Sequence, residues 1–262
     1  MRLRARGGRN HRVLVLCYHA VSEDWDAALS VTPDAFRRQL VALLSQGWVG
    51  AKFTDAVLDP PAPKTLAVTF DDAYDSVRLR AAPVLAELGL PGTVFVPTDW
   101  PGRGLMQWPG IDQWTATPFK QELTPMSWED LRVLSAADWE VGSHTCSHPH
   151  LPQLDADSIG HELSESRAVC QRQLGRPCRS VAYPFGEADD RVRAAAGYDA
   201  AAGLWSRAFV SRDRFDWPRV GVWHREPDWR FRLKVSPVPA RMRASRAARA
   251  LDWVRRRTPH TS

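Results

Sequence analysis

The stretch TLAVTFDDA, residues 65–73, runs from six uncharged residues directly into two adjacent carboxylates. A short apolar segment rich in Val, Thr and Phe is typical of a strand that is buried on both faces of a parallel sheet. The segments VLVLCYH (13–19), TVFV (93–96) and WEVGSH (139–144) have a similar pattern. We therefore expect a sheet whose strands lead into polar loops.

Helical segments alternate with these strands. Thr32 followed by Pro33 predicts the start of a helix, and Gly47 predicts its end. Further elements are expected as helices over 74–88, 128–137, 155–174 and 188–196, and as strands over 178–184 and 199–205. Such alternation predicts an α/β fold with a parallel sheet. Six or seven units in about 220 residues favour a closed or nearly closed, distorted (β/α) barrel of about seven parallel strands over an open doubly wound sheet.

Length and composition exclude several classes of protein. The chain has 262 residues, of which 44% are hydrophobic and 25% charged, as is typical of a globular protein with a sizeable core. No stretch reaches the ~18 uninterrupted apolar residues of a transmembrane helix. The apolar run after the basic N-terminus is too short for a signal peptide, and the four cysteines form no C-x-x-C pair. These features predict a cytoplasmic protein.

The net charge of +5 is concentrated at the two ends of the chain. Residues 1–12 contain five Arg and no acid, and residues 230–257 contain nine Arg and one Lys against one acid. The body between them is acidic, which argues against nucleic-acid binding. We expect a basic arm at 1–12, a barrel domain at 13–235 and an Arg-rich helix or tail at 236–262. The tail either packs on its own domain or lies on the anionic inner face of a membrane.

Asp71 and Asp72 follow the buried strand 65–70 without an intervening residue. Two carboxylates at this point need a neutralising cation, because burying a charge is costly. One alternative is that they only cap the next helix. Since neighbouring side chains at a strand end diverge, one carboxylate can bind a metal ion while the other stays available as a base.

His144 and His148 lie four residues apart after another predicted strand. Two neutral imidazoles at this spacing can reach one centre, and imidazole is a preferred ligand of zinc and similar ions. With a carboxylate from another strand end they make three protein ligands and leave a position for water, which is the pattern of a catalytic site. Cys146, between the two histidines, is expected to fill space and not to bind the ion.

Three segments together are similar to the motifs of a known family. TFDDA (69–73), SHTCSHP (143–149) and AYPFG (182–186) resemble the first three motifs of the polysaccharide deacetylases, the NodB-homology family or carbohydrate esterase family four. LCYHAV (16–21) and FRRQLVALLSQGW (36–48) resemble a branch of that family with an early Tyr-His pair. The resemblance implies a NodB-like barrel that removes acetyl groups from N-acetylated sugars with a divalent metal, for which we expect zinc.

The resemblance also implies roles for the matching residues. Asp72, His144 and His148 match the metal ligands, and Asp71 matches the catalytic base. His19 matches the general acid of the branch with the early Tyr-His pair.

The remaining assignments concern the acid and the oxyanion. His224, in a late segment, is the alternative general acid. Phe185 stands where the backbone N–H of a Tyr usually helps to bind the oxyanion, and Tyr18 is expected beside the substrate.

Two positions depart from the family pattern. Ala73 replaces the usual Gly, which is tolerable if the backbone there does not need a positive φ. Ala182 replaces the usual Arg of the third motif, so Arg179 or Arg219 would have to orient Asp71, and we favour Arg219.

Other interpretations remain beside the leading one. Trp100, Trp108 and Trp114 in the insertion 97–126 are either sugar-stacking platforms or a small loop core. The chain could also be a non-catalytic carbohydrate-binding barrel, or a metal-independent amidohydrolase acting on a non-sugar amide such as a cyclic ureide. The intact Asp-Asp pair disfavours the first and the two histidines disfavour the second. For a deacetylase, the candidate substrates are oligosaccharides, lipid-linked sugars and nucleotide sugars.

Overall fold

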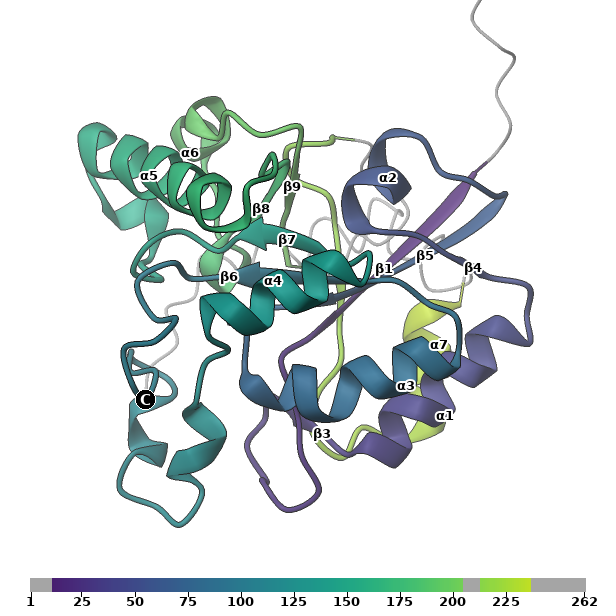
Figure 1. Cartoon of the computed structure of the whole chain (residues 1–262). Coiled ribbons are helices and arrows are strands. Elements are labelled where there is room, and N and C mark those ends of the chain that lie inside the picture. The colour runs from purple at the N-terminus through teal and green to yellow at the C-terminus, as the bar shows by residue number, and fades with distance from the viewer. Residues whose placement is uncertain (1–10, 205–212, 237–262) are drawn as a thin grey trace, which may run out of the picture.

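The computed structural model describes residues 11–204 and 213–236, arranged as in Figure 1. The predicted arm at 1–12 and tail at 236–262 lie almost entirely outside these residues, as does the segment 205–212. The described part therefore corresponds to the predicted barrel domain.

A parallel sheet lies at the centre of the described residues, and helices pack around it (Figure 1). Its strand order is β10-β1-β5-β6-β7-β8-β9, and β4 pairs with the first half of β5. The strands are β1 (Arg12–Tyr18), β4 (Val49–Gly50), β5 (Lys64–Phe70), β6 (Gly92–Val96), β7 (Glu140–Ser143), β8 (Ser180–Ala182), β9 (Ala200–Ala202) and β10 (Val220–Gly221). A separate pair consists of β2 (Ala20–Val21) and β3 (Ser30–Val31). Because the strands of the main sheet are parallel, their carboxyl ends share one rim.

The sheet curls into a distorted barrel, and one late segment approaches both of its edges. After β9, the backbone of Trp217 pairs with that strand, and Gly203 N–H donates to Trp217 O at 3.0 Å. Three residues later, Val220 in β10 pairs with Leu16 in β1. The prediction of a distorted (β/α) barrel with about seven parallel strands is confirmed.

The helices begin and end where the sequence has recognisable caps. Thr32 caps α1 (Pro33–Leu44) by accepting from Ala35 N–H, and a capping box between Ser127 and Asp130 begins α4 (Trp128–Ala136). The remaining helices are α2 (Phe53–Leu58), α3 (Ala82–Glu87), α5 (Ala156–Leu174), α6 (Asp190–Ala195) and α7 (Asp228–Val235), with short 3₁₀ turns at Asp112–Trp114, Lys120–Leu123, Leu151–Gln153 and Pro184–Gly186.

The helix predicted over 74–88 is interrupted. A π-helical turn at Val77–Ala81 precedes α3. Pro83 lies at the start of α3, and because it has no backbone N–H it cannot continue an α-helical hydrogen-bond ladder through this point.

The two faces of β1 enter two different apolar cores. Leu14, Leu16 and Tyr18 pack in the larger core between the sheet and the helices. Val15 packs in a smaller core inside the barrel, with Phe95, Ala182, Ala200 and Ala202 among its members. Since side chains alternate along a strand, the next inward positions are residues 17 and 19.

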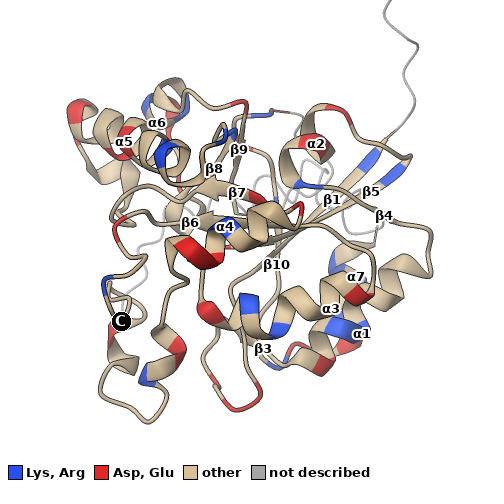
Figure 2. Cartoon of the chain, viewed as in Figure 1, with Lys and Arg blue, Asp and Glu red and all other residues tan. Residues whose placement is uncertain are grey.

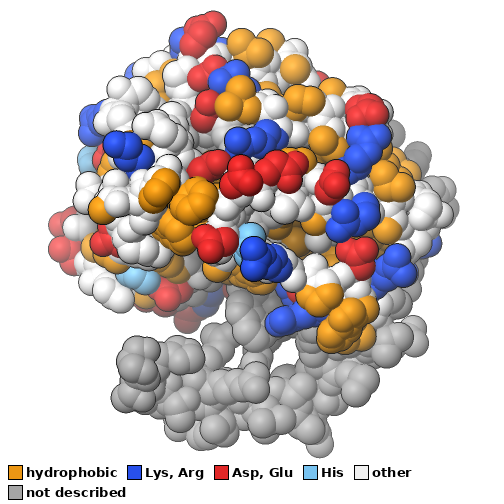
Figure 3. All heavy atoms as spheres, turned by 90° about the horizontal axis from the view of Figure 1, so that it is seen from below, with side chains coloured by type: hydrophobic (Ala, Val, Ile, Leu, Met, Phe, Trp, Pro, Cys, Tyr) orange, Lys and Arg blue, Asp and Glu red, His pale blue; other side chains and the backbone are white. Residues whose placement is uncertain are grey.

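Acidic and basic side chains are mixed over the described surface. Both colours occur on the same helices in Figure 2, and they lie side by side on the face in Figure 3. Ion pairs such as Arg37–Glu87 and Arg179–Asp199 connect them. Among the described residues, this face has no continuous basic surface of the kind that nucleic-acid binding requires. None of the described helices has the length and apolar character needed to cross a membrane.

Candidate functional site

The carboxyl ends of the strands bring the predicted polar residues to one rim of the barrel. Asp71 and Asp72 directly follow β5, and His144 directly follows β7. Asp71 N–H donates to Tyr18 O at 3.0 Å, and His144 N–H donates to Val96 O at 2.8 Å. These bonds continue the sheet pairing by one residue and so fix where each segment leaves its strand.

Asp72, His144 and His148 form a compact group of possible metal ligands. Asp72 Oδ1 lies 3.4 Å from His144 Nε2 and 3.5 Å from His148 Nε2, and all three side chains are buried. Both distances exceed the usual length of an N–H···O hydrogen bond. They match the spacing of about 3.4 Å between donor atoms that surround one zinc ion tetrahedrally at about 2.1 Å.

The backbone orients His144 for this role. Its Nδ1 lies 2.8 Å from Ala182 O, and because a carbonyl oxygen only accepts, Nδ1 carries the proton and Nε2 presents its lone pair. Asp72 Oδ1 is buried without a hydrogen-bond partner among the described residues. A buried carboxylate oxygen that faces two imidazole nitrogens fits a divalent cation, and one carboxylate with two imidazoles suits zinc.

Glu162 of α5 holds the loop between the two histidines. One of its carboxylate oxygens accepts from the backbone N–H groups of Cys146 at 2.7 Å and Ser147 at 3.1 Å, and the other accepts from the Ser147 hydroxyl at 2.6 Å. Cys146 is therefore part of this turn and does not belong to the ligand group, as expected. No sequence pattern distinguishes Glu162, because it is one acid among several on a long amphipathic helix.

The backbone is strained at the site. Five of the seven described non-glycine residues with positive φ belong to its segments: Asp72, Ala73, Thr145, His148 and Phe185. The left-handed region is costly for these residues and is occupied mainly where the surroundings enforce it. Ala73 has φ 55°, which is in the left-handed region that favours glycine. Having Ala in place of Gly at this position therefore costs conformational free energy.

Aromatic rings enclose His148. Trp108 stacks on its imidazole with 4.4 Å between ring centroids, and Phe185 meets it edge-on at 4.7 Å. Burial lowers the pKa of His148 to about 4, which favours the neutral form that binds metals. Trp100 packs on Trp108 and Trp114 packs on Trp25, so the three indoles of the insertion join the main core instead of forming a separate loop core.

Asp71 is held by a buried arginine. Arg219 donates to both carboxylate oxygens, at 2.6 and 2.7 Å, and its other donors reach Thr69 Oγ1 and Gly203 O. Burial alone would raise the pKa of Asp71, but the charge of Arg219 outweighs it and holds that pKa well below its usual value. Asp71 is thus held in the ionised form that a general base requires. Arg179, the other candidate, pairs instead with surface acids.

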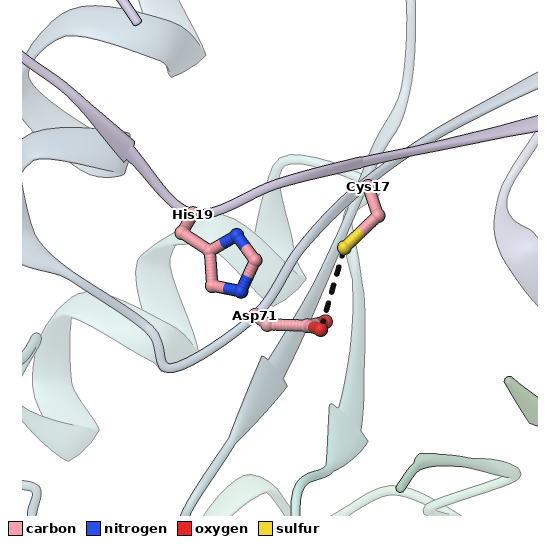
Figure 4. A group of neighbouring side chains, drawn as sticks. All are labelled: Cys17, His19 and Asp71. Atoms are coloured by element: carbon pink, nitrogen blue, oxygen red, sulfur yellow. Dashed lines mark hydrogen bonds between the residues drawn. The ribbon is translucent and has the colours of Figure 1, made fainter. Parts of the chain in front are cut away.

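Cys17 and His19 extend from β1 toward Asp71 (Figure 4). The Cys17 thiol lies 3.4 Å from Asp71 Oδ2 and donates to it, and the donor atoms of Cys17, His19 and Asp71 are all within 4.8 Å of one another. Burial lowers the pKa of His19, although the charges of Asp72 and Asp71 oppose this. Cys17 is fully buried, and no pattern in the sequence indicates its contact with Asp71.

The structure distinguishes the two candidates for the general acid. Trp223 stacks on His19 with 5.8 Å between ring centroids, whereas no described contact joins His224 to Asp71 or Asp72. Both ring nitrogens of His224 are buried without a hydrogen-bond partner among the described residues. His19, and not His224, is brought to the carboxylates.

Tyr18 is not brought into the site. Its hydroxyl donates to Gln39 Oε1 at 2.8 Å, and its ring packs on Phe36 and Phe70 in the outer core. The physical reason is strand alternation: with residues 17 and 19 directed into the barrel, residue 18 points to the helices. The expectation that Tyr18 lies beside the substrate is therefore corrected.

Phe185 lies at the rim as expected. Its φ of 58° turns the chain after β8, and its ring, 38% exposed, lies flat on His150 with 3.8 Å between centroids. The segment around Phe185 thus borders the candidate metal ligands. The binding of an oxyanion by the backbone N–H at this position remains a prediction.

Comparisons with known proteins agree with this architecture. The family model described as polysaccharide deacetylase matches residues 59–201, more than half of the chain. That range contains Asp71, Asp72, His144, His148 and Phe185, but neither His19 nor Arg219. YxkH of Bacillus subtilis (strain 168), which carries the polysaccharide deacetylase name, is 23% identical over 187 residues, or 70% of this chain and 60% of that protein. The chain therefore spans about three fifths of the length of this curated relative.

Solved structures share the fold. Polysaccharide deacetylase BC0361 from Bacillus cereus superposes with a TM-score of 0.69 and 22% identity, covering 86% of this chain and 69% of that one. IcaB from Ammonifex degensii gives 0.70 and 24%, covering 86% and 96%. The deacetylase PplD from Streptococcus pyogenes, solved in complex with acetate, gives 0.69 and 20%, covering 86% and 99%.

Proposed function

Because this chain belongs to the polysaccharide deacetylase family, we propose that it hydrolyses the N-acetyl group of an N-acetylated amino sugar and releases acetate. The observation that carries the proposal is that two adjacent carboxylates have different partners. Asp72 faces two histidines at 3.4 and 3.5 Å, whereas Asp71 is bound by Arg219 and remains outside that group.

Asp72, His144 and His148 would hold the metal, for which we propose zinc. When bound, such an ion supplies a Lewis acid that activates water and polarises the amide carbonyl. Asp71, kept ionised by Arg219, accepts the proton of the attacking water. The backbone near Phe185 supports the oxyanion that develops on the carbonyl.

His19 then protonates the nitrogen of the leaving amine. Its low pKa makes it neutral at rest, so it has to receive a proton during turnover, and Asp71 lies within 4.8 Å. Water and the acetamide thus become acetate and a free amino sugar. Replacing His19 by Ala should lower kcat with metal content unchanged, while His224→Ala serves as the control. The reverse result would move the general acid to the late segment.

The two alternative functions lack such support. A non-catalytic carbohydrate-binding barrel has no need of an ionised Asp71 placed beside a ligand group. A metal-independent amidohydrolase has no need of two buried imidazoles directed at Asp72.

The test measures metal content and acetate release together. Purified protein is given an N-acetylglucosamine oligomer, a lipid-linked N-acetyl sugar and a nucleotide N-acetyl sugar, and we expect acetate from at least one. His148→Ala should lose both the metal and the activity. A wild-type protein that binds zinc but releases no acetate from any of the three substrates would contradict the proposal.

A further inference from the structure

A second group of metal-binding side chains lies beside the first, at the end of β1. Cys17, His19 and Asp71 bring together a thiol, an imidazole and a carboxylate, with one ligand atom of each within 4.8 Å of the others (Figure 4). We propose that these three residues form a second, weaker site for a thiophilic divalent cation such as Zn²⁺ or Cd²⁺, and that its occupation inhibits the enzyme. The inhibition, though not the binding, rests on the deacetylase function proposed above.

Strand pairing brings the three side chains together. Cys17 lies in β1 and His19 directly follows it, so the two side chains point to the same side, into the barrel. Asp71 directly follows β5, which pairs with β1 along its whole length. The bond from Asp71 N–H to Tyr18 O, at 3.0 Å, fixes the two chains between Cys17 and His19. The group is therefore held by the ends of two paired strands and not by a long loop.

The contact between Cys17 and Asp71 has nearly the length that a shared zinc ion requires. Cys17 Sγ lies 3.4 Å from Asp71 Oδ2 and donates its proton to that oxygen. A sulfur at about 2.3 Å and an oxygen at about 2.1 Å from a tetrahedral zinc ion are about 3.6 Å apart. A cation can therefore replace the thiol proton between these two atoms with little movement. In that step the S–H bond breaks, a bond from sulfur to the metal forms and the proton leaves to solvent.

His19 supplies the third ligand. Its ring points toward Asp71 in Figure 4, and its Nδ1 is buried without a hydrogen-bond partner among the described residues. No group at Nδ1 therefore fixes the tautomer, in contrast to His144, whose Nδ1 is held by Ala182 O. A thiolate, an imidazole and a carboxylate together suit Zn²⁺ or Cd²⁺ better than Mg²⁺ or Ca²⁺, which prefer oxygen ligands alone.

The charge of Arg219 sets the order in which the two groups fill. Arg219 donates to both oxygens of Asp71, so a cation at the second group shares that carboxylate with a guanidinium. Each cation brings two positive charges and the thiol gives up one, so the net charge beside Arg219 rises. We therefore expect the first metal equivalent at Asp72, His144 and His148, and a second equivalent that binds at least about tenfold more weakly.

Occupation of the second site takes both groups that move protons in the proposed reaction. His19 cannot carry a proton to the leaving amine through a nitrogen that binds a cation. Asp71 becomes a weaker base when a cation shares its charge, since the cation disfavours its protonated form. Zinc in excess of the first equivalent should therefore lower acetate release.

The binding experiment uses Co²⁺, which occupies zinc sites and gives a near-ultraviolet charge-transfer band when it binds a thiolate. Metal-free, full-length protein is titrated while the absorbance and the released protons are recorded. We expect no thiolate band with the first equivalent, and a band with proton release with the second. Cys17→Ser, which keeps a donor toward Asp71, should lose the band. Cys146→Ser, which removes the other thiol near the rim, is the matched control and should keep it.

A second variant tests the imidazole ligand. His19→Ala should weaken binding of the second Co²⁺ ion about tenfold, the effect of about 1.4 kcal/mol, and leave the affinity for the first ion unchanged.

The activity experiment measures acetate release with one and with several equivalents of Zn²⁺, and each protein is compared with its own rate at one equivalent. Wild-type protein and Cys146→Ser should lose activity at least about tenfold as the second site fills, because two proton-transfer groups are taken. Cys17→Ser should keep most of its own rate over the same range of zinc concentrations.

Three results would overturn the inference: a second equivalent that gives no thiolate band, a band that survives in Cys17→Ser, or equal inhibition by zinc in Cys17→Ser and wild-type protein. Failure of the proposed function looks different, because the wild-type protein would then release no acetate at any zinc concentration while the band of the second Co²⁺ equivalent still forms.

Discussion

Two carboxylates lie inside the same barrel, at its opposite ends, and their surroundings shift their pKa values in opposite directions. Asp71 follows the carboxyl end of β5 and has a buried guanidinium against both of its oxygens. Glu140 begins β7, at the other end, where Thr54 N–H (2.9 Å), the Ser180 hydroxyl (2.6 Å) and the Thr54 hydroxyl donate to it. Burial raises the pKa of Glu140, and these neutral donors offset only part of the increase.

The comparison shows that burial alone does not make a carboxylate functional. Asp71 is buried with a guanidinium against both of its oxygens, whereas Glu140 is half-buried and its hydrogen-bond donors are neutral groups. At the carboxyl-end rim the fold holds a carboxylate paired with Arg219 beside the buried group of Asp72, His144 and His148. At the opposite end a carboxyl group with neutral partners ties β7 to α2 and β8.

The largest expected effect separates the two carboxylates by chemistry. Asp71→Asn should lower kcat by about 10²–10⁴ with the metal content unchanged, because the proposed base is removed and the proposed ligands are not. Glu140→Gln is the matched control and should keep activity within a few-fold. Acetate release and metal analysis on both variants check this, and a drop of only a few-fold in Asp71→Asn would end its assignment as the base.

The next effect concerns the positive charge of Arg219, which lies beside Asp71 and not beside Glu140. Arg219→Leu leaves Asp71 buried without a counter-charge and should cost about 3–5 kcal/mol of unfolding free energy. Adding Asp71→Asn to Arg219→Leu should restore most of that loss, since no charge is then buried. Urea unfolding of the two single variants and the double variant measures the coupling; simple additivity would show that the pair does not act as a unit.

A smaller effect tests how the rim is held. Glu162→Ala frees the turn between His144 and His148 and should weaken zinc binding about 10- to 100-fold, as the loss of an outer-shell support does. Glu165→Ala on the same helix removes an exposed partner of Arg172 and serves as the control. Competition with a zinc chelator gives both affinities, and equal values would remove Glu162 from the site.

The smallest effect is a pH dependence at the opposite end. The pKa of Glu140 is raised above its usual 4.5, so its protonated form favours folding, and this contribution is present below pH 4.5 and lost as pH rises through the folded-state pKa. Gln does not titrate. Glu140→Gln should therefore gain stability relative to wild type as pH rises. Unfolding curves from pH 4 to 8 check the sign; a stability gain of Glu140→Gln that shrinks as pH rises would mean that folding lowers the pKa of Glu140.

Much of the site was predictable because its residues adjoin strands. Asp71, Asp72 and His144 follow β5 and β7 in the sequence itself, and the parallel topology then requires them to meet. The position of Tyr18 could also have been predicted, since the alternation that directs His19 inward directs its neighbour outward.

The remaining parts depend on distant contacts. Arg219 is favoured over Arg179 from the sequence as the partner of Asp71, but the two-residue strand next to it is too short to decide between them, and the contact spans 148 positions. Glu162 and Cys17 act through loop geometry and a thiol contact that no local signal encodes. The positive φ of Ala73 depends on how β5 meets the rest of the rim.

The long separation of Asp71 and Arg219 in the sequence also means that the two residues can pair only late in synthesis. As the chain is synthesised, the segments carrying Asp72, His144 and His148 are complete about seventy residues before Arg219 is added. Contacts between distant positions form late, because the intervening chain must first be ordered. Until then Asp71 has no guanidinium, and burial would favour its protonated form. The nascent barrel can thus gather Asp72, His144 and His148 before Arg219 is available, and the segment that pairs with β1 to complete the described sheet also brings the charge that keeps Asp71 ionised.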